Sequence, residues 1–201
     1  MKKNLKKVLL LVLCAALLVS VTVAGTVAYL TSTAKVENTF TVGQVKITMD
    51  EALVNEYGQP INNTTDKTVV DVANAPRVTG NTYKLIPGFT YTKDPIIHVD
   101  ASSEECYLFV KITKGKNFTI GEMNGWTRIE NTDVWYYNST AKAGDDVEVF
   151  KTITYAADAV NGETTPTENA FVVEAYAVQK ATFSGATAAW EATFGKSATN
   201  P

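Results

Sequence analysis

The sequence predicts an all-β fold of the antiparallel sandwich or barrel type. From residue 40 onward, apolar and polar side chains alternate in short segments rich in Val, Ile, Thr, Tyr and Phe. Gly, Asn, Asp and Pro bound these segments, a pattern typical of strands joined by turns. Many short strands with frequent turns indicate a sandwich or a barrel, with room for only one or two short helices.

Before this region, the first 28 residues have the layout of a secretory signal peptide. Four lysines precede an apolar stretch at 8–24, and the small residues Thr26 and Ala28 follow, two positions apart. A signal peptidase requires small residues at this spacing, so we expect cleavage between Ala28 and Tyr29 and a secreted product. Because the apolar run approaches the shortest membrane span, an uncleaved anchor is the alternative.

After cleavage, residues 29–39 form a short polar arm with no core pattern, followed by a β domain at 40–195 and a tail at 196–201. An unpaired sheet edge can bind an extended segment of another chain by β-augmentation. We therefore expect the arm to act as a donor strand, the alternative being a frayed terminus.

The expected strands of the domain follow one another at short intervals. They are residues 40–49, 67–73, 82–86, 95–100, 105–113, 126–130, 134–138, 147–155 and 170–179. The segment 105–113 places four side chains on what we predict to be the core face: Cys106, Leu108, Val110 and Ile112. The opposite face of that segment carries Tyr107, Phe109 and Lys111.

Between the strands, the turn residues predict a compact meander at 118–138. Asn124-Gly125 suits a type I′ hairpin turn, and Asn131-Thr132-Asp133 a second reversal. Residues 55–66 and 161–169 are predicted loops. Helix is expected only as one turn within 154–160 and as a short C-terminal helix at 186–193.

Charge and cysteine content narrow the classes of function. The chain after the leader contains 14 basic and 21 acidic residues, because four of the 18 basic residues lie in the leader. This excess of negative charge argues against a nucleic-acid partner. Cys14 lies in the leader, so no disulfide can form within the mature chain. We expect Cys106 to be a buried thiol, the alternatives being intermolecular pairing or a reactive group.

The sequence contains no recognisable motif of a hydrolytic enzyme, such as His-Glu-x-x-His or Gly-x-Ser-x-Gly. His98 is the single histidine, whereas a catalytic zinc usually takes three protein ligands. Asp145 and Asp146 could contribute to a calcium site, but they suit a solvated turn equally well. We expect no catalytic residue, no metal and no cofactor.

Aromatic residues at 135–137 suggest a contact surface. Trp135, Tyr136 and Tyr137 place large rings on both faces of one strand, so at least one set either lies exposed or has a cover besides the sandwich core. That cover is a loop, another subunit or a carbohydrate.

Ordered segments along most of the chain together resemble the TasA/camelysin family, whose exported proteins are processed by a SipW-type signal peptidase. Near the leader these are Gly25-Thr26-Val27-Ala28-Tyr29-Leu30-Thr31, Asn38-Thr39-Phe40-Thr41-Val42-Gly43 and Val45-Lys46-Ile47. In the middle they are Leu85-Ile86-Pro87-Gly88-Phe89-Thr90, Ile96-Ile97-His98-Val99 and Cys106-Tyr107-Leu108-Phe109-Val110-Lys111. Further on they are Gly125-Trp126, Val134-Trp135-Tyr136-Tyr137-Asn138, Gly144-Asp145, Val149-Phe150, Val173-Glu174-Ala175-Tyr176-Ala177-Val178-Gln179 and Ala188-Ala189-Trp190.

The resemblance implies a jelly-roll-like sandwich and a structural role in biofilm-matrix or cell-surface fibres. The N-terminal segment of one subunit would complete a sheet of the next, and the expected partners are further copies, the signal peptidase and an accessory matrix protein. We expect the subunit contact at Tyr29, Leu30, Val36, Phe40, Trp135 and Tyr137. The alternatives are a monomeric surface-binding module and, third, a camelysin-like metalloprotease.

Overall fold

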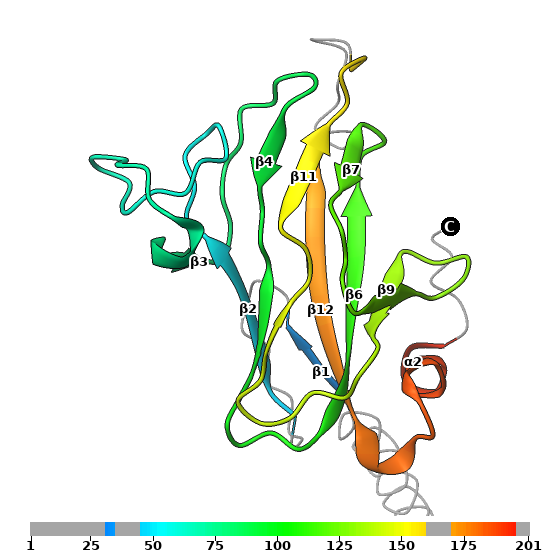
Figure 1. Cartoon of the computed structure of the whole chain (residues 1–201). Helices are drawn as coiled ribbons and strands as arrows, with labels where there is room; N and C mark the ends of the chain where they lie inside the picture. Colours follow the sequence, from blue (N-terminus) through cyan, green and yellow to red (C-terminus); the bar gives the residue numbers. More distant parts are fainter. Residues whose placement is uncertain (1–30, 35–44, 160–169, 196–201) are drawn as a thin grey trace, which may run out of the picture.

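The computed structural model describes residues 31–34, 45–159 and 170–195. Within these ranges the chain forms antiparallel sheets and, near the C-terminus, the α-helix α2 (Ala186–Phe194), as Figure 1 shows. This arrangement confirms the predicted all-β sandwich. In the described part of the chain, no helix is both long and apolar enough to cross a membrane.

The first layer is a five-stranded sheet with β6 and β12 at its centre. Its strands, in spatial order, are β1 (Thr31–Ala34), β12 (Phe171–Gln179), β6 (Cys106–Lys114), β9 (Val134–Tyr137) and β8 (Trp126–Arg128). β6 and β12 pair along their full length, from Cys106 opposite Gln179 to Lys114 opposite Phe171. The predicted strands 105–113, 126–130, 134–138 and 170–179 are therefore confirmed.

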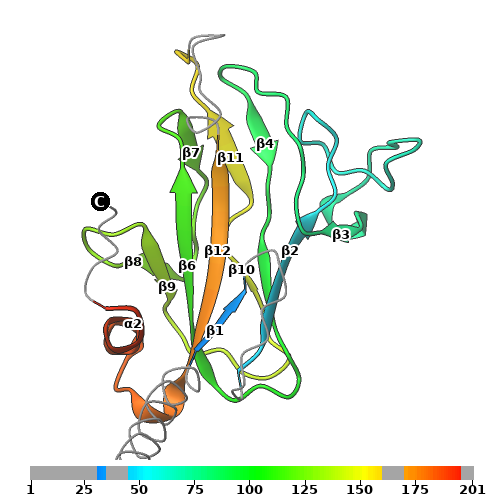
Figure 2. The same ribbon diagram turned by 180° about the vertical axis from the view of Figure 1, so that it is seen from behind.

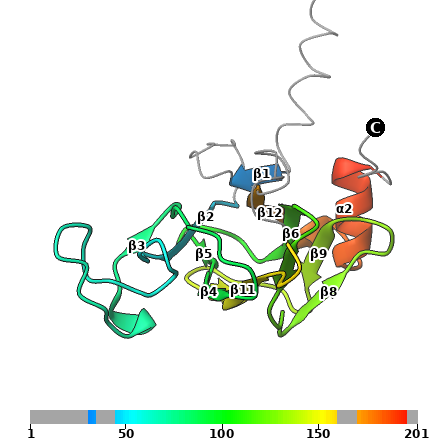
Figure 3. The ribbon, with the colours of Figure 1, turned by 90° about the horizontal axis from the view of Figure 1, so that it is seen from above.

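The second layer consists of two smaller sheets that share continuous stretches of chain. One sheet contains β10 (Asp146–Glu148), β5 (Ile96–Val99), β2 (Ile47–Ala52) and β3 (Arg77–Val78). The other contains β4 (Thr90–Thr92), β11 (Thr152–Tyr155) and β7 (Phe118–Ile120). β4 continues into β5 and β10 into β11, and Figures 1 and 3 show this layer facing β12 and β6.

The main core lies between the two layers. The predicted core face of β6 is confirmed, because Cys106, Leu108, Val110 and Ile112 are at most 2% exposed. They pack with Ile97 and Ile153 of the second layer. Burial of this apolar surface is the main stabilising term of such a sandwich.

The opposite face of β6 is buried as well, beneath α2. Phe109 is fully buried, and its ring centre lies 5.1 Å from that of Trp190 on the helix. Tyr107 belongs to the same cluster. The helix predicted at 186–193 is therefore present, and Figure 3 shows it beside β6 and β9, away from β11.

Two predicted strands are wrong. In 67–73, Lys67 has a φ of 52°, which a strand cannot accommodate, and Asp71 caps the 3₁₀-helix Val72–Asn74. In 82–86, the side chains alternate between half-buried and exposed, but the backbone pairs with no strand. Instead Lys84 N–H donates to the Glu56 carbonyl, at 2.7 Å.

Other predicted boundaries need correction. The expected strand 147–155 is two strands, β10 and β11, because the consecutive buried residues Val149 and Phe150 break the alternation and the chain bends at Lys151. Of 40–49, residues 47–49 lie in β2 and 40–44 fall outside the described residues. The short strands β3 and β4 were not predicted.

The turns also differ in part from the expectation. Gly125 has a φ of 81°, but Asn124 does not have a positive φ, so the predicted type I′ turn is wrong. Trp126 N–H donates to the Met123 carbonyl at 3.2 Å, which together with Gly125 fits a type II turn. The reversal at 131–133 is confirmed, with Asn131 at a φ of 57°.

The remaining predicted segments have mixed outcomes. Residues 55–66 are irregular, as predicted. In 154–160, Thr154 and Tyr155 belong to β11, and a single turn follows in which Ala159 N–H donates to the Ala156 carbonyl. The loop at 161–169 and the tail at 196–201 lie outside the described residues.

Candidate functional site

The outer edge of β12 receives a strand from the predicted N-terminal arm. β1 lies antiparallel to β12, with Thr31 opposite Val178 and Ala34 opposite Ala175. Figures 2 and 3 show β1 beside β12, on the side where β2 lies. A segment with no core pattern of its own therefore completes a sheet edge by backbone pairing.

This strand covers only part of the edge. β1 pairs with residues 175–178, whereas β6 pairs with all nine residues of β12 on the other side. At 171–173 this edge pairs with no second strand in the described residues. Val172 is 46% exposed there, and a cavity of about 230 Å³ separates this stretch from Met49 and Glu51 of β2.

The predicted contact residues fall into two groups. Tyr29, Leu30, Val36 and Phe40 lie outside the described residues. Trp135 and Tyr137 lie on β9, near the opposite end of the sheet from β1. The structure thus brings Trp135 and Tyr137 together but does not bring them to the edge where β1 pairs.

Trp135 and Tyr137 are half-buried and pack against the main core. The guanidinium of Arg128 lies 5.2 Å from the centre of the Trp135 ring, and the Tyr137 ring lies 5.4 Å from that of Trp126. Tyr136 faces the other way and joins the cluster beneath α2. The cover for the second face of this strand is therefore the C-terminal helix.

The single histidine links three strands of the second layer. His98 on β5 has Nδ1 2.6 Å from Asp146 Oδ1 on β10, and Nε2 3.0 Å from Asp50 Oδ1 on β2. Burial by itself lowers the pKa of His98, but the two carboxylates outweigh it and raise the pKa above its usual value. Nδ1 therefore shares a hydrogen bond with Asp146, and Nε2 lies within ion-pair distance of Asp50.

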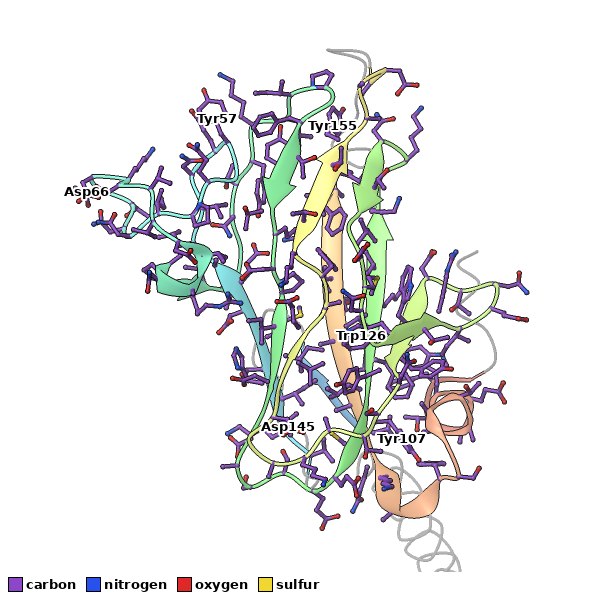
Figure 4. The ribbon with its side chains drawn as sticks, viewed as in Figure 1. Tyr57, Asp66, Tyr107, Trp126, Asp145 and Tyr155 are labelled. Atoms are coloured by element: carbon purple, nitrogen blue, oxygen red, sulfur yellow. The ribbon has the colours of Figure 1, made fainter. Side chains whose placement is uncertain are left out.

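The acidic residues considered for a calcium site do not converge on one point. Asp145 Oδ2 accepts the backbone N–H of Lys142, while Asp146 contacts His98. Figure 4 shows Asp66 and Asp145 in loops far apart in the molecule. Among the described residues, no group of three or more His, Cys, Asp or Glu side chains is placed to hold a metal ion.

Cys106 is fully buried, as predicted. Burial raises the pKa of its thiol to about 12, and the charges of Asp145 and Glu105 act in the same direction. A thiol in this state is a poor nucleophile at neutral pH.

Two clusters of buried charge were not predicted from the sequence. Arg77 Nη1 lies 2.6 Å from Asp94 Oδ2, and Lys93 Nζ lies 2.6 Å from Glu51 Oε2. Asp94 and Glu51 are both less than 10% exposed. Their partners lie 17 and 42 positions away in the sequence, so only the folded chain shows the pairing.

Comparison with known proteins gives one match. Residues 3–75 match a protein family described as "Camelysin metallo-endopeptidase". A search of the curated proteins and a search of the solved structures each returned no match.

Proposed function

We propose that this protein is an exported structural subunit of extracellular fibres, because the match over residues 3–75 supports the resemblance to the TasA/camelysin family. The fibres belong to a biofilm matrix or a cell surface. Subunits join head to tail, each placing its N-terminal strand on the β12 edge of the next. The observation that carries this proposal is the pairing of β1 with β12.

Strand exchange at this edge preserves the contacts of the single chain. The backbone ladder between 31–34 and 175–178 is the same whether both strands come from one copy or from two. Exchange therefore loses few contacts, and protein concentration shifts the balance towards the assembled form. Because each copy then donates one strand and accepts another, the contact repeats into a filament.

Deleting the arm tests this proposal. Mature protein starting at Tyr29 is compared with a variant that lacks residues 29–39, and both are imaged by negative-stain electron microscopy. We expect the variant to stay a folded monomer without fibres, because the donor strand is gone. A variant lacking the tail at 196–201 is the matched control and should form fibres normally. Undiminished fibres from the arm deletion would contradict the proposal.

Export is part of the same proposal. We propose that a SipW-type peptidase removes the leader between Ala28 and Tyr29, so that the arm is released before assembly. N-terminal sequencing of the secreted protein tests the cleavage position. Dependence of fibre growth on a second secreted protein would identify an accessory matrix component.

The family description gives a reason to test a second candidate, a metallo-endopeptidase. A zinc hydrolase needs convergent ligands and a water that the metal activates. Each nitrogen of His98 lies within 3.0 Å of a carboxylate oxygen, so a metal bound to this histidine would have to displace an ion pair. Zinc analysis of purified protein together with a casein digestion assay distinguishes the candidates: stoichiometric zinc and chelator-sensitive digestion would support the peptidase.

A further inference from the structure

A buried carboxylate holds an amine and a carboxamide at the end of β2. Lys93 Nζ donates to Glu51 Oε2 at 2.6 Å, and Asn81 Nδ2 donates to Glu51 Oε1 at 2.9 Å. The side chains of Lys93 and Glu51 are only 12% and 6% exposed. Each oxygen of Glu51 thus binds one of two groups that can react with each other.

The carboxamide of Asn81 is fixed in one orientation. Its Oδ1 accepts the backbone N–H of Val54 at 3.0 Å, and its Nδ2 also donates to the Ala52 carbonyl at 2.9 Å. The N–H of Val54 polarises the amide carbonyl. If a nucleophile added to Cγ of Asn81, negative charge would develop on Oδ1, and the N–H of Val54 would stabilise that charge by its hydrogen bond.

Two aromatic rings flank the amine of Lys93. Lys93 Nζ lies 5.8 Å from the centre of the Tyr83 ring and 5.8 Å from that of the Phe171 ring. Tyr83 is held in place by its hydroxyl, which donates to the Thr92 carbonyl at 3.1 Å. Burial raises the pKa of Tyr83, and the charges of Glu51 and Asp94 raise it further.

We propose that Lys93 and Asn81 join in an intramolecular isopeptide bond, with Glu51 carrying the protons. The inference does not depend on fibre assembly. In surroundings poor in water, an ion pair can exchange its proton to become a neutral amine and a neutral acid. The isopeptide bond would link the segment before β4, which contains Asn81, to the junction of β4 with β5, which contains Lys93.

The reaction needs no external reagent. Glu51 takes a proton from the Lys93 ammonium, and the neutral Nζ attacks Cγ of Asn81, which places negative charge on Oδ1 near the Val54 N–H. Glu51 then passes its proton to Nδ2 and removes one from Nζ, and the Cγ–Nδ2 bond breaks. Ammonia leaves, takes the proton from Glu51 and departs as ammonium. The cavity of about 230 Å³ is lined by all three residues and gives it an exit.

Mass spectrometry of the secreted, denatured protein tests the bond directly. Formation releases one ammonia, so the linked form is lighter than the sequence by about 17 Da. Trypsin should not cleave after Lys93, and the peptide 78–84 should remain attached to 85–111 through Asn81 and Lys93. Fragmentation of this linked pair separates it from cyclisation at Asn124-Gly125, which gives the same mass loss without a link.

The opposite result is equally clear. Free peptides 78–84 and 85–93 at their unmodified masses would overturn the proposal, because the three residues would then form only an ion pair and a hydrogen bond. A linked product with Lys93 joined to Glu51 would also overturn the assigned roles. This digest uses the unaltered chain, so its outcome does not depend on any variant folding.

Variants then test the role of each group. E51Q keeps the shape of the side chain but cannot cycle protons, and we expect the linked fraction to fall from near completion to none. N81A and K93R remove one reacting partner and should have the same result. The matched control K84R changes a neighbouring exposed lysine and should leave the link intact. Full linkage in E51Q would contradict the role of Glu51.

Discussion

The two central strands of the first layer, β6 and β12, are equally long but differ in how their edges are covered. Both contain nine residues, and each buries side chains on both faces. β6 pairs with β12 on one side, and its other edge pairs at 109–111 with β9 and at Cys106 with Ala141, both of which follow it within the β domain. β12 pairs with β6 throughout, but its other edge pairs at 175–178 with β1, which comes from the N-terminal arm.

Because of this difference, we expect the residues that stabilise the fold to differ from those that support assembly. The faces of both strands supply the apolar burial that stabilises the fold. The outer edge of β12 contributes mainly backbone pairing, which can be supplied equally well by another chain. Changes at the faces should therefore affect folding, whereas changes at the outer edge should affect assembly.

The largest expected effect is at the face of β6 beneath α2. Phe109→Ala removes a fully buried ring that packs on Trp190. We expect the free energy of unfolding to fall by about 3–5 kcal/mol. Urea denaturation followed by tryptophan fluorescence measures it. A loss under about 1 kcal/mol would show that α2 does not stabilise this face.

Val172→Ala on β12 is the matched comparison. Val172 is 46% exposed beside the uncovered part of the edge. We expect its truncation to change the free energy of unfolding by less than about 1 kcal/mol in the same denaturation experiment. An effect as large as that of Phe109→Ala would remove the distinction between the two strands.

Proline in β1 should block assembly at a small cost in stability. Proline has no N–H to donate and is poorly tolerated inside a paired strand. In an edge strand, the backbone N–H of every second residue points toward the neighbouring strand. One of the adjacent residues Ser32 and Thr33 therefore donates its N–H to β12, so Ser32→Pro and Thr33→Pro are both made. We expect the variant that loses a donor to form no fibres and to lose about 1 kcal/mol of stability. Ser32→Ala and Thr33→Ala are the controls and should form fibres, and fibres from both proline variants would argue against pairing through β1.

The smallest effect concerns pH and the second layer. The carboxylates of Asp50 and Asp146 raise the pKa of His98 in the folded state, so protonated His98 stabilises the fold. This contribution is complete below the unfolded pKa of about 6.5 and disappears as the pH rises through the folded value. Because His98 is partly exposed, we expect it to be at most about 1 kcal/mol. Thermal unfolding between pH 5 and pH 9 should show the loss in the unaltered protein and not in His98→Gln, and identical profiles would refute the assignment.

Alternation in the sequence predicts which face a side chain occupies better than it predicts which strand it pairs with. In 105–113 the core face was identified correctly, and the burial of Phe109 became clear only with the helix that covers it. In 82–86 the side chains alternate as in a strand, yet Lys84 N–H bonds to a loop carbonyl. Pairing depends on distant segments, which local periodicity does not contain.

The same limit applies to the candidate site. The arm was recognised from its position and polarity, but the edge that receives it follows only from the register of β1 with β12. The group formed by Glu51, Asn81 and Lys93 joins segments up to 42 positions apart. No motif marks such a group, because its chemistry arises from the way the loops fold over the end of β2.

Mixed cysteine variants test the central claim most directly, because Ser32 and Ala177 are opposite each other in the β1–β12 pair. One batch of protein carries Ser32→Cys, a second carries Ala177→Cys, and the two are mixed, assembled under oxidising conditions and run on a non-reducing gel. Strand exchange predicts disulfide-linked dimers containing one copy of each variant, and none when Ser32→Cys is mixed with unaltered protein, whose Cys106 is buried. A double variant, which carries both cysteines in one chain, is assembled in the same way. Fibres without linked dimers in the mixture, together with a complete disulfide within each chain of the double variant, would contradict exchange of the N-terminal strand.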